Sequence, residues 1–224
     1  IGPFLGRPLV VGEEELKDAP RVDGTYAQRH LLGPEDIAYS KKMPQDQGAR
    51  WQVYRPSATF TDPDTDEILG HEVSYLGDAI LEGFDKDTKV STLKITSAVL
   101  EIQKGDYFAQ AGTGFSSNYQ PHAPSGKIDT KVISIYGGIR QAGQNAVVTL
   151  NKNMHDGLEN GHVLALYQKG EVLKTKKWFT PNTVLPNVRY GLLFVFRVFD
   201  KVSYALVMET KFPVKILDRA STPE

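Results

Sequence analysis

The chain between residues 192 and 208 reads Leu192-Leu193-Phe194-Val195-Phe196-Arg197-Val198-Phe199-Asp200-Lys201-Val202-Ser203-Tyr204-Ala205-Leu206-Val207-Met208. Apolar, β-branched and aromatic residues dominate both halves of this stretch, and such runs favour β-strands. The polar pair Asp200-Lys201 separates the halves and is suited to a tight turn. The stretch therefore predicts a β-hairpin in which Leu192 to Phe199 is one strand and Val202 to Met208 is the other.

The turn of this hairpin belongs to an internal repeat. The triplet Lys201-Val202-Ser203 has a copy at Lys89-Val90-Ser91, 112 positions earlier. At the same offset Ile95, Ile102 and Asp106 match Val207, Val214 and Asp218. Further upstream, Val53-Tyr54 matches Leu166-Tyr167 and Leu69-Gly70 matches Tyr190-Gly191. These offsets differ from 112, as changes in loop length would produce. A repeat of this length predicts a duplicated small domain rather than a solenoid unit of ~20–50 residues.

The rest of the chain is also patterned as short strands. Within Thr92-Leu93-Lys94-Ile95-Thr96 apolar residues alternate with polar ones, as on a half-buried antiparallel strand. No window carries a helical apolar stripe over three turns. We therefore predict an all-β protein with two duplicated small β-barrel-like, Greek-key-like domains, because closure protects sheet edges. The residues expected in the two cores are Leu93, Ile95, Leu192, Phe194, Phe196, Ala205 and Val207.

Changes in composition along the chain predict the domain boundaries. Residues 1–20 contain Gly-Pro and Arg-Pro pairs and an acidic run, which favour an extended lead-in that can hold one helical turn around Glu13 to Lys17. Residues 21–111 form the first β domain and residues 127–219 the second, followed by a tail at 220–224. Residues 112–126 have the Gly, Pro and Ser content of a linker between domains.

Bulk composition narrows the function classes. The chain has 224 residues, a net charge of −1, 40% hydrophobic residues, 24% charged residues and no cysteine. A near-neutral chain lacks the basic face of a general nucleic-acid binder. No apolar run approaches the ~18 residues that cross a bilayer, so we expect no membrane span. Because the chain starts at Ile1 and shows no leader pattern, we expect it to be an excised part of a longer protein.

Two loops carry the candidate contact residues. Asp62-Pro63-Asp64-Thr65-Asp66 resembles the start of a calcium loop, but such loops need glycine at position six and glutamate at position twelve, where Glu67 and Val73 stand. We expect a solvated hairpin tip there, since Asp-Pro and Asp-Thr pairs form turns.

The five histidines never occur at metal-binding spacing, so no metal site and no cofactor are expected.

The second loop, Lys174-Thr175-Lys176-Lys177-Trp178-Phe179, is basic and aromatic. Stacking on Trp178 beside Lys174, Lys176 and Lys177 would suit an anionic polymer, and a solvated loop is the simpler interpretation. In the repeat this loop takes the place of the acidic loop with Asp62, Asp64, Asp66 and Glu67. Loops of opposite charge at equivalent places can dock against each other, within one chain or between chains.

Several stretches resemble the region that follows the LysM motif in exported, LysM-bearing proteins of proteobacteria. They are residues 3–11, Trp51-Gln52-Val53-Tyr54-Arg55-Pro56, Asp62-Pro63-Asp64-Thr65 with Leu69-Gly70, Asp156 to Tyr167, and Tyr190 to Phe199. The resemblance implies a periplasmic or cell-envelope location and an upstream LysM module that binds peptidoglycan. It implies no catalytic residues, and the chain itself carries no LysM signature.

These observations lead to a functional expectation. No thiolate, metal cluster or base–nucleophile pair is visible in the sequence, so we expect no enzymatic activity and no catalytic residues. The chain is expected to be a non-catalytic envelope interaction or scaffold module, held at the cell wall by the LysM module and bound to an envelope protein partner. The alternative is direct binding of peptidoglycan or another anionic polymer by the chain itself, through Lys174 to Phe179.

Overall fold

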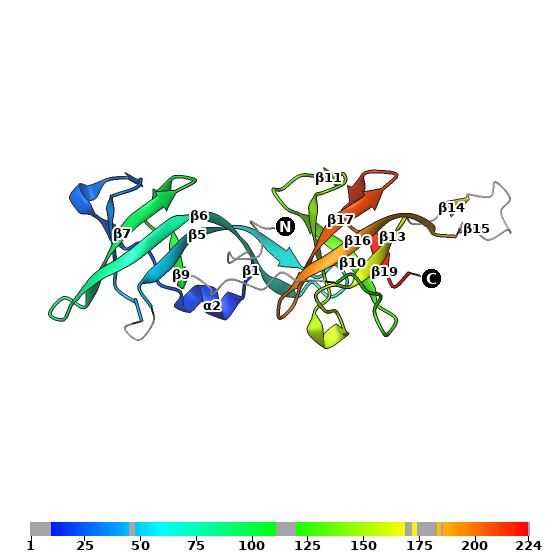
Figure 1. Cartoon of the computed structure of the whole chain (residues 1–224), viewed down its shortest axis with the longest axis horizontal. Helices are drawn as coiled ribbons and strands as arrows, with labels where there is room; N and C mark the ends of the chain where they lie inside the picture. The colour runs from blue at the N-terminus through cyan, green and yellow to red at the C-terminus, as the bar shows by residue number, and fades with distance from the viewer. Residues whose placement is uncertain are drawn as a thin grey trace. The chain divides into compact units, whose positions relative to one another are not determined.

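The computed structural model covers residues 1–224 and describes residues 10–44, 48–110, 120–168, 172–173, 183–184 and 186–223. Strands make up 55% of the described residues and helices 6% (Figure 1). The helical elements are α2 (Glu13–Asp18), η1 (Tyr26–Gln28) and η2 (Met154–Asp156). The predicted all-β class is therefore confirmed.

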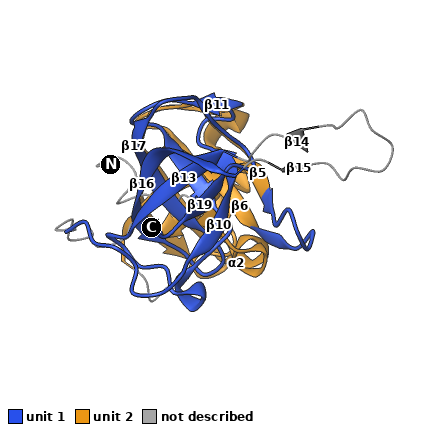
Figure 2. Ribbon diagram, turned by 90° about the vertical axis from the view of Figure 1, so that its right-hand side faces the viewer, with its two compact units in different colours: residues 1, 60–69, 118–224 blue, residues 2–59, 70–117 orange. Residues whose placement is uncertain are grey.

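The chain divides into two compact units, which Figure 2 shows in blue and orange. Unit 2 comprises Gly2–Thr59 and Gly70–Ser117, whereas unit 1 comprises Ile1, Phe60–Leu69 and Asn118–Glu224. The predicted boundaries placed residues 60–69 in the first domain. The structure assigns them to unit 1, because the end of the hairpin formed by β5 (Arg50–Thr61) and β6 (Ile68–Asp85) makes its contacts there.

Unit 1 contains a closed barrel with the strand order β10 (Asp129–Ile135), β12 (Val147–Leu150), β17 (Ser203–Thr210), β16 (Val188–Val198), β13 (Val163–Gln168) and β19 (Arg219–Ser221). The short strand β19 closes the barrel, because it pairs with β10 on one side and with β13 on the other. Closure removes the exposed edges of the sheet. Ala220 and Ser221 are thus barrel residues, and the predicted tail at 220–224 is too long by these two residues.

The predicted hairpin at residues 192–208 is present as the antiparallel pair β16 and β17. The barrel core includes Leu193, Val195, Ala205 and Val207. Of the residues expected in this core, Leu192 is only half-buried, and Phe194 and Phe196 are buried without belonging to the cluster that fills the barrel. Phe194 and Phe196 are therefore buried as predicted, but the sequence could not show that Leu193 and Val195 fill the barrel, because an uninterrupted apolar run shows no alternation from which to read the inward face.

Unit 2 contains a seven-stranded sheet with the order β2 (Gly24–Thr25), β4 (Ile37–Ser40), β7 (Val90–Ala98), β6, β5 and β9 (Tyr107–Gln110), and β1 (Val10–Val11) also pairs with β6. An isolated bridge joins Arg21 to Tyr107. Leu93 and Ile95 are fully buried in its core, as the alternation in β7 predicted. The described residues also form three two-stranded pairs: β3 (Leu31–Leu32) with β8 (Ile102–Gln103), β11 (Gln141–Ala142) with β18 (Val214–Lys215), and β14 (Val172–Leu173) with β15 (Thr183–Val184).

Strand pairs in the two units correspond at offsets close to the one seen in the sequence. Ser91 of β7 pairs with Ser40, and Ser203 of β17, 112 positions later, pairs with Leu150. The pairs β3–β8 and β11–β18 correspond in the same way, since Ile102 and Val214 are also 112 positions apart. The partners of these residues, Ser40 and Leu150 in the first case and Leu32 and Ala142 in the second, are 110 positions apart. An origin of the two units by duplication stays a prediction.

One sequence match within the repeat needs correction. Gly77 pairs with Ala98 and Gly191 pairs with Thr210, and residues 98 and 210 are again 112 positions apart. The counterpart of Gly191 is therefore Gly77 and not Gly70. A Cβ atom at Gly191 would lie 2.5 Å from the carbonyl oxygen of Glu209, and one at Gly77 would overlap the carbonyl oxygen of Ser97. Both positions bring neighbouring strands too close for a side chain, which explains glycine at each.

Candidate functional site

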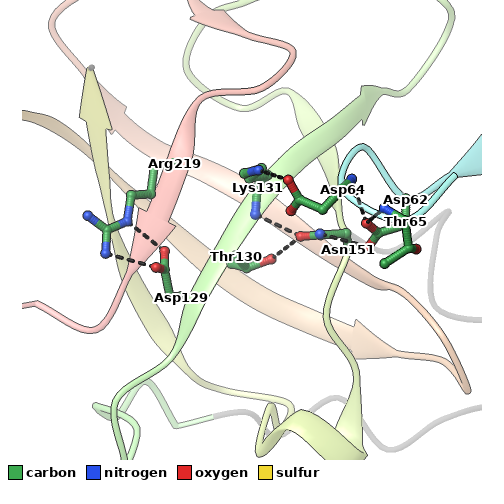
Figure 3. Close-up of polar contacts among 8 residues, drawn as sticks. All are labelled: Asp62, Asp64, Thr65, Asp129, Thr130, Lys131, Asn151 and Arg219. Atoms are coloured by element: carbon green, nitrogen blue, oxygen red, sulfur yellow. Dashed lines mark hydrogen bonds and ion pairs between the residues drawn. The ribbon is translucent and has the colours of Figure 1, made fainter. Parts of the chain in front are cut away.

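A cavity of about 790 Å³ that carries several charged side chains lies on unit 1. Its lining comes from the acidic tip (residues 62–67, the turn between β5 and β6), from β10, from the residues after β12 and from β19 (Figure 3). The polar groups that define it are Asp62, Asp64, Asp129, Lys131, Asn151 and Arg219. These residues come from four separate segments of the sequence, and the fold brings them together.

The acidic tip is a tight turn that Asp62 organises. Its Oδ1 accepts hydrogen bonds from the backbone N–H groups of Asp64 (2.8 Å) and Thr65 (3.2 Å). Asp66 has a left-handed backbone with φ of 59°, a conformation that aspartate tolerates better than most residues. The expected hairpin tip is therefore present at these residues.

The turn between β6 and β7 is built in the same way, which explains why aspartates occur two residues apart in both turns. There the sequence Asp85-Lys86-Asp87-Thr88 repeats the pattern Asp62-Pro63-Asp64-Thr65. Asp85 Oδ1 accepts hydrogen bonds from the N–H groups of Asp87 (2.8 Å) and Thr88 (3.0 Å). Turn formation by the first aspartate thus explains the pattern at both places, and a calcium loop is not needed to explain it.

Asn151 links the acidic tip to the barrel. Its side-chain oxygen accepts hydrogen bonds from Thr130 Oγ1 (3.0 Å) and from the N–H of Lys131 (2.8 Å), both on β10. Its side-chain N–H₂ group donates to Asp62 Oδ2 at 3.0 Å. Figure 3 shows Asn151 between the strand and the tip. Asn151 is 8% exposed, so these bonds form where water competes little.

Ion pairs surround this central contact. Lys131 Nζ lies 2.5 Å from Asp64 Oδ1, and Arg219 binds both carboxylate oxygens of Asp129, at 2.6 and 2.9 Å. The paired side chains are between 37% and 59% exposed. Each pair therefore contributes only ~0–1 kcal/mol to stability, and its main effect is to fix the positions of the charges.

The environment of Asp62 favours its ionised form. Burial acts to raise the pKa of Asp62, but the hydrogen bonds from Asp64, Asn151 and Thr65 and the charge of Lys152 together hold it below its ordinary value. Asp62 is thus a carboxylate at neutral pH, with both oxygens engaged. Such a group accepts hydrogen bonds and is poorly suited to donate a proton.

The structure places the predicted contact residues as follows. Asp62 and Asp64 line the cavity, while Asp66 belongs to the acidic tip without lining it. Glu67, the remaining carboxylate of the tip, pairs with Lys201 at 2.5 Å. The loop residues Lys174, Lys176, Lys177 and Trp178 lie outside the described residues, so their docking against the tip stays a prediction.

Sequence analysis missed most of the cavity. Asn151, Lys131, Asp129 and Arg219 were not among the predicted contact residues, although all four line it. Each is a polar residue at or near a strand end and belongs to no motif, and such residues are common on any β protein. The available signal was the Asp-x-Asp-Thr turn at residues 62–65. This turn pattern predicts the residues on one side of the cavity, and it gives no information about the residues on and near β10, β12 and β19 on the other side.

A second cluster, in the same unit, has metal-binding side chains. In the described part of the chain, His122, Glu159 and His162 form the group of three residues whose ligand atoms all lie within 4.8 Å of one another. His122 and Glu159 are exposed and His162 is buried. Burial and then the nearby His122 lower the pKa of His162, although Glu159 acts to raise it. The histidines are far apart in sequence, so spacing rules could not find this group.

Comparisons of the sequence with protein-family models and with curated proteins give no match. In the described part of the chain, none of the helices has the length and apolar character that crossing a bilayer requires. The conclusions about this site therefore rest on its own geometry.

Proposed function

We propose that this chain is a non-catalytic interaction module of the bacterial cell envelope, acting in the periplasm beside a LysM module that binds peptidoglycan. The supporting observation is the state of the cavity on unit 1. Its charged groups each have a partner, since Asp62 binds Asn151, Lys131 pairs with Asp64, Arg219 with Asp129, and Lys152 with Asp156, which holds donors and acceptors at fixed positions. A fixed array of this kind suits recognition of a polar partner surface, because preorganised groups lose little freedom on binding.

The chemistry of the cavity favours binding over catalysis. Cleavage of a glycan needs a carboxylic acid whose raised pKa lets it donate a proton, opposite a second carboxylate. The pKa of Asp62 is shifted downward instead. Asp64 and Asp129 are engaged by Lys131 and Arg219. The carboxylates of the cavity therefore act as hydrogen-bond acceptors in this proposal.

Direct binding of peptidoglycan or another anionic polymer is the second candidate. The cavity volume of about 790 Å³ is in the ~300–1,000 Å³ range of ligand pockets, and Lys131, Lys152 and Arg219 supply positive charge. Among the described residues that line it there is no aromatic ring on which a sugar could stack. The basic and aromatic loop at residues 174–179, which could supply one, lies outside the described residues. We therefore rank this candidate second.

Site-specific cross-linking tests the first candidate. A photoreactive amino acid at position 152, on the cavity, is compared with one at position 86, in the exposed turn of unit 2, in envelopes of bacteria that make the full-length protein. We expect a discrete protein adduct at position 152 that the substitution Arg219→Glu removes. The absence of an adduct at 152, or equal adducts at both positions, would refute a partner site at the cavity.

Sedimentation with purified sacculi separates the two candidates. The chain alone is expected to stay in the supernatant and to release no muropeptides, whereas the same chain fused to a LysM module is expected to sediment. Sedimentation of the chain alone that is lost in Lys176→Ala/Trp178→Ala supports direct polymer binding by the loop. Release of muropeptides contradicts the non-catalytic proposal.

A further inference from the structure

His122, Glu159 and His162 come together through the fold of unit 1. His122 precedes β10, and the other two lie in the connection between η2 and β13. An isolated parallel bridge joins His122 to His162, and their rings lie edge to face with centroids 4.8 Å apart. This cluster is separate from the cavity described above, since none of its residues lines that cavity.

His122 is held in the orientation typical of a metal ligand. Its Nδ1 lies 2.9 Å from the carbonyl oxygen of Gln120, which only accepts, so Nδ1 carries the proton and the lone pair of Nε2 is available. Metal-binding histidines usually donate their second ring N–H to a carbonyl or carboxylate in this way. The backbone fixes the residue as well, since the His122 N–H donates to Gly161 (3.0 Å) and its carbonyl accepts from Val163 (2.9 Å).

Gly161 provides the space for this ring. Its φ of +102° is unfavourable for other residues, and a Cβ atom there would lie 2.8 Å from His122 Cε1 and 2.9 Å from the carbonyl oxygen of Gln120. A side chain at position 161 would therefore displace the His122 ring and the carbonyl that orients it. The backbone at this point is shaped around the imidazole.

His162 is the buried member of the cluster. Its Nδ1 accepts a hydrogen bond from the Glu159 N–H at 3.1 Å. A metal ion requires that the ring give up this bond, because a neutral imidazole has a single lone pair and the other nitrogen carries the proton. The loss of one such bond lowers affinity by up to about tenfold, which is small beside the affinity that three ligands supply.

We propose that His122, Glu159 and His162 form a binding site for a divalent transition-metal ion, with Zn²⁺ as the first candidate. Two imidazoles and one carboxylate are a ligand set that zinc favours, and a fourth position is left for water or for a group of a partner. Ligand atoms in a tetrahedral zinc site lie ~3.3 Å apart, so the atoms now within 4.8 Å must approach further. The exposed side chain of Glu159 can make this movement, and the His162 ring turns when it gives up its hydrogen bond to the Glu159 N–H. The bound ion would tie the segment before β10 to the loop before β13.

Metal titration of the untagged chain tests the proposal. Co²⁺ is added to the protein and its visible absorption is recorded, and Zn²⁺ is then used to displace it and is titrated separately by calorimetry. We expect one site per chain, with dissociation constants in the micromolar range or below, and a melting temperature that rises with Zn²⁺. The absence of cysteine means that thiolates contribute nothing to the Co²⁺ spectrum.

Variants assign the site to the cluster. His122→Ala is expected to weaken Zn²⁺ binding at least a hundredfold and Glu159→Gln at least tenfold, and the exposed His155→Ala is the matched control that leaves it unchanged. Far-UV circular dichroism checks that each variant is folded. Because His122 and Glu159 are exposed, these two variants test the site without touching the buried His162. No binding at 100 µM metal, or binding that both variants retain in full, overturns the proposal.

Discussion

The contact between Asn151 and Asp62 allows a sharp test of the geometry of the cavity. The substitution Asn151→Asp replaces the N–H₂ group with an oxygen of almost the same size, 3.0 Å from Asp62 Oδ2. The oxygen of residue 151 that accepts from Thr130 and Lys131 is retained. The variant thus exchanges one hydrogen bond for a pair of facing carboxylates and changes little else.

The size of the effect follows from three terms. Loss of a hydrogen bond to a charged group costs ~1.5–3 kcal/mol. Repulsion between two unit charges 3.0 Å apart adds ~1.4 kcal/mol in water and ~5.5 kcal/mol at an effective dielectric constant of 20. Protonation of one of the two carboxyl groups removes the repulsion and restores a hydrogen bond between them. At pH 7 this protonation costs ~4 kcal/mol, so the total loss of stability cannot exceed that value. We expect Asn151→Asp to lower the free energy of unfolding by about 3–4 kcal/mol.

The reciprocal substitution supplies the control. In the double variant Asp62→Asn/Asn151→Asp, donor and acceptor exchange places, and the net charge equals that of the wild type. Asparagine at position 62 can still organise the turn. We expect the double variant to unfold within about 1 kcal/mol of the wild type and the coupling energy of the cycle to be at least about 2 kcal/mol.

Urea unfolding at pH 7, followed by circular dichroism and by hydrogen exchange in β10 and β12, measures the cycle. Repulsion raises the pKa of one carboxyl in folded Asn151→Asp above its unfolded value, so stability is lost as pH rises through that pKa. The deficit should therefore shrink between pH 7 and pH 4. A coupling energy below about 0.5 kcal/mol, or a deficit independent of pH, would refute the contact between Asn151 and Asp62.

Three further predictions concern stability. Gly77→Ala should lower the free energy of unfolding by about 2 kcal/mol or more, because the added Cβ atom would overlap the Ser97 carbonyl oxygen. Gly83→Ala, with no atom within 4 Å of the added Cβ, should be neutral or stabilising by up to about 1 kcal/mol, and thermal melting distinguishes the two variants. Arg55→Met should lower the free energy of unfolding, measured in urea, by about 2–3 kcal/mol, because the buried Asp106 (side chain 3% exposed) loses two hydrogen bonds of 2.7 and 2.8 Å. This loss is smaller than for a fully buried ion pair because the Arg55 side chain is 39% exposed. The lowered pKa of Asp62 stabilises the fold above its unfolded pKa, so that part of the stability should be lost as pH falls below about 4, and Asp62→Asn should flatten the pH dependence in that window.

The arrangement of β7 could be predicted because its sequence carries the necessary information. Polar residues interrupt the apolar ones at every second position in Thr92 to Thr96, and Leu93 and Ile95 point into the core of unit 2 as expected. In Leu192 to Phe196 every residue is apolar, so either face of the strand could turn inward. Pairing with β13 and β17 decided the matter, with Leu193 and Val195 inside the barrel.

Local sequence patterns were enough to predict the all-β class, the hairpin of β16 and β17 and the acidic turn, because these patterns and turn chemistry act between neighbouring residues. Only the tertiary structure brought Asn151 to Asp62 and Lys131 to Asp64, across separations of 89 and 67 residues. The same is true of His122 and His162, which a bridge between distant segments places side by side. Such contacts depend on which strands pair and in which register, and that choice reflects the burial of the entire core rather than the residues that meet.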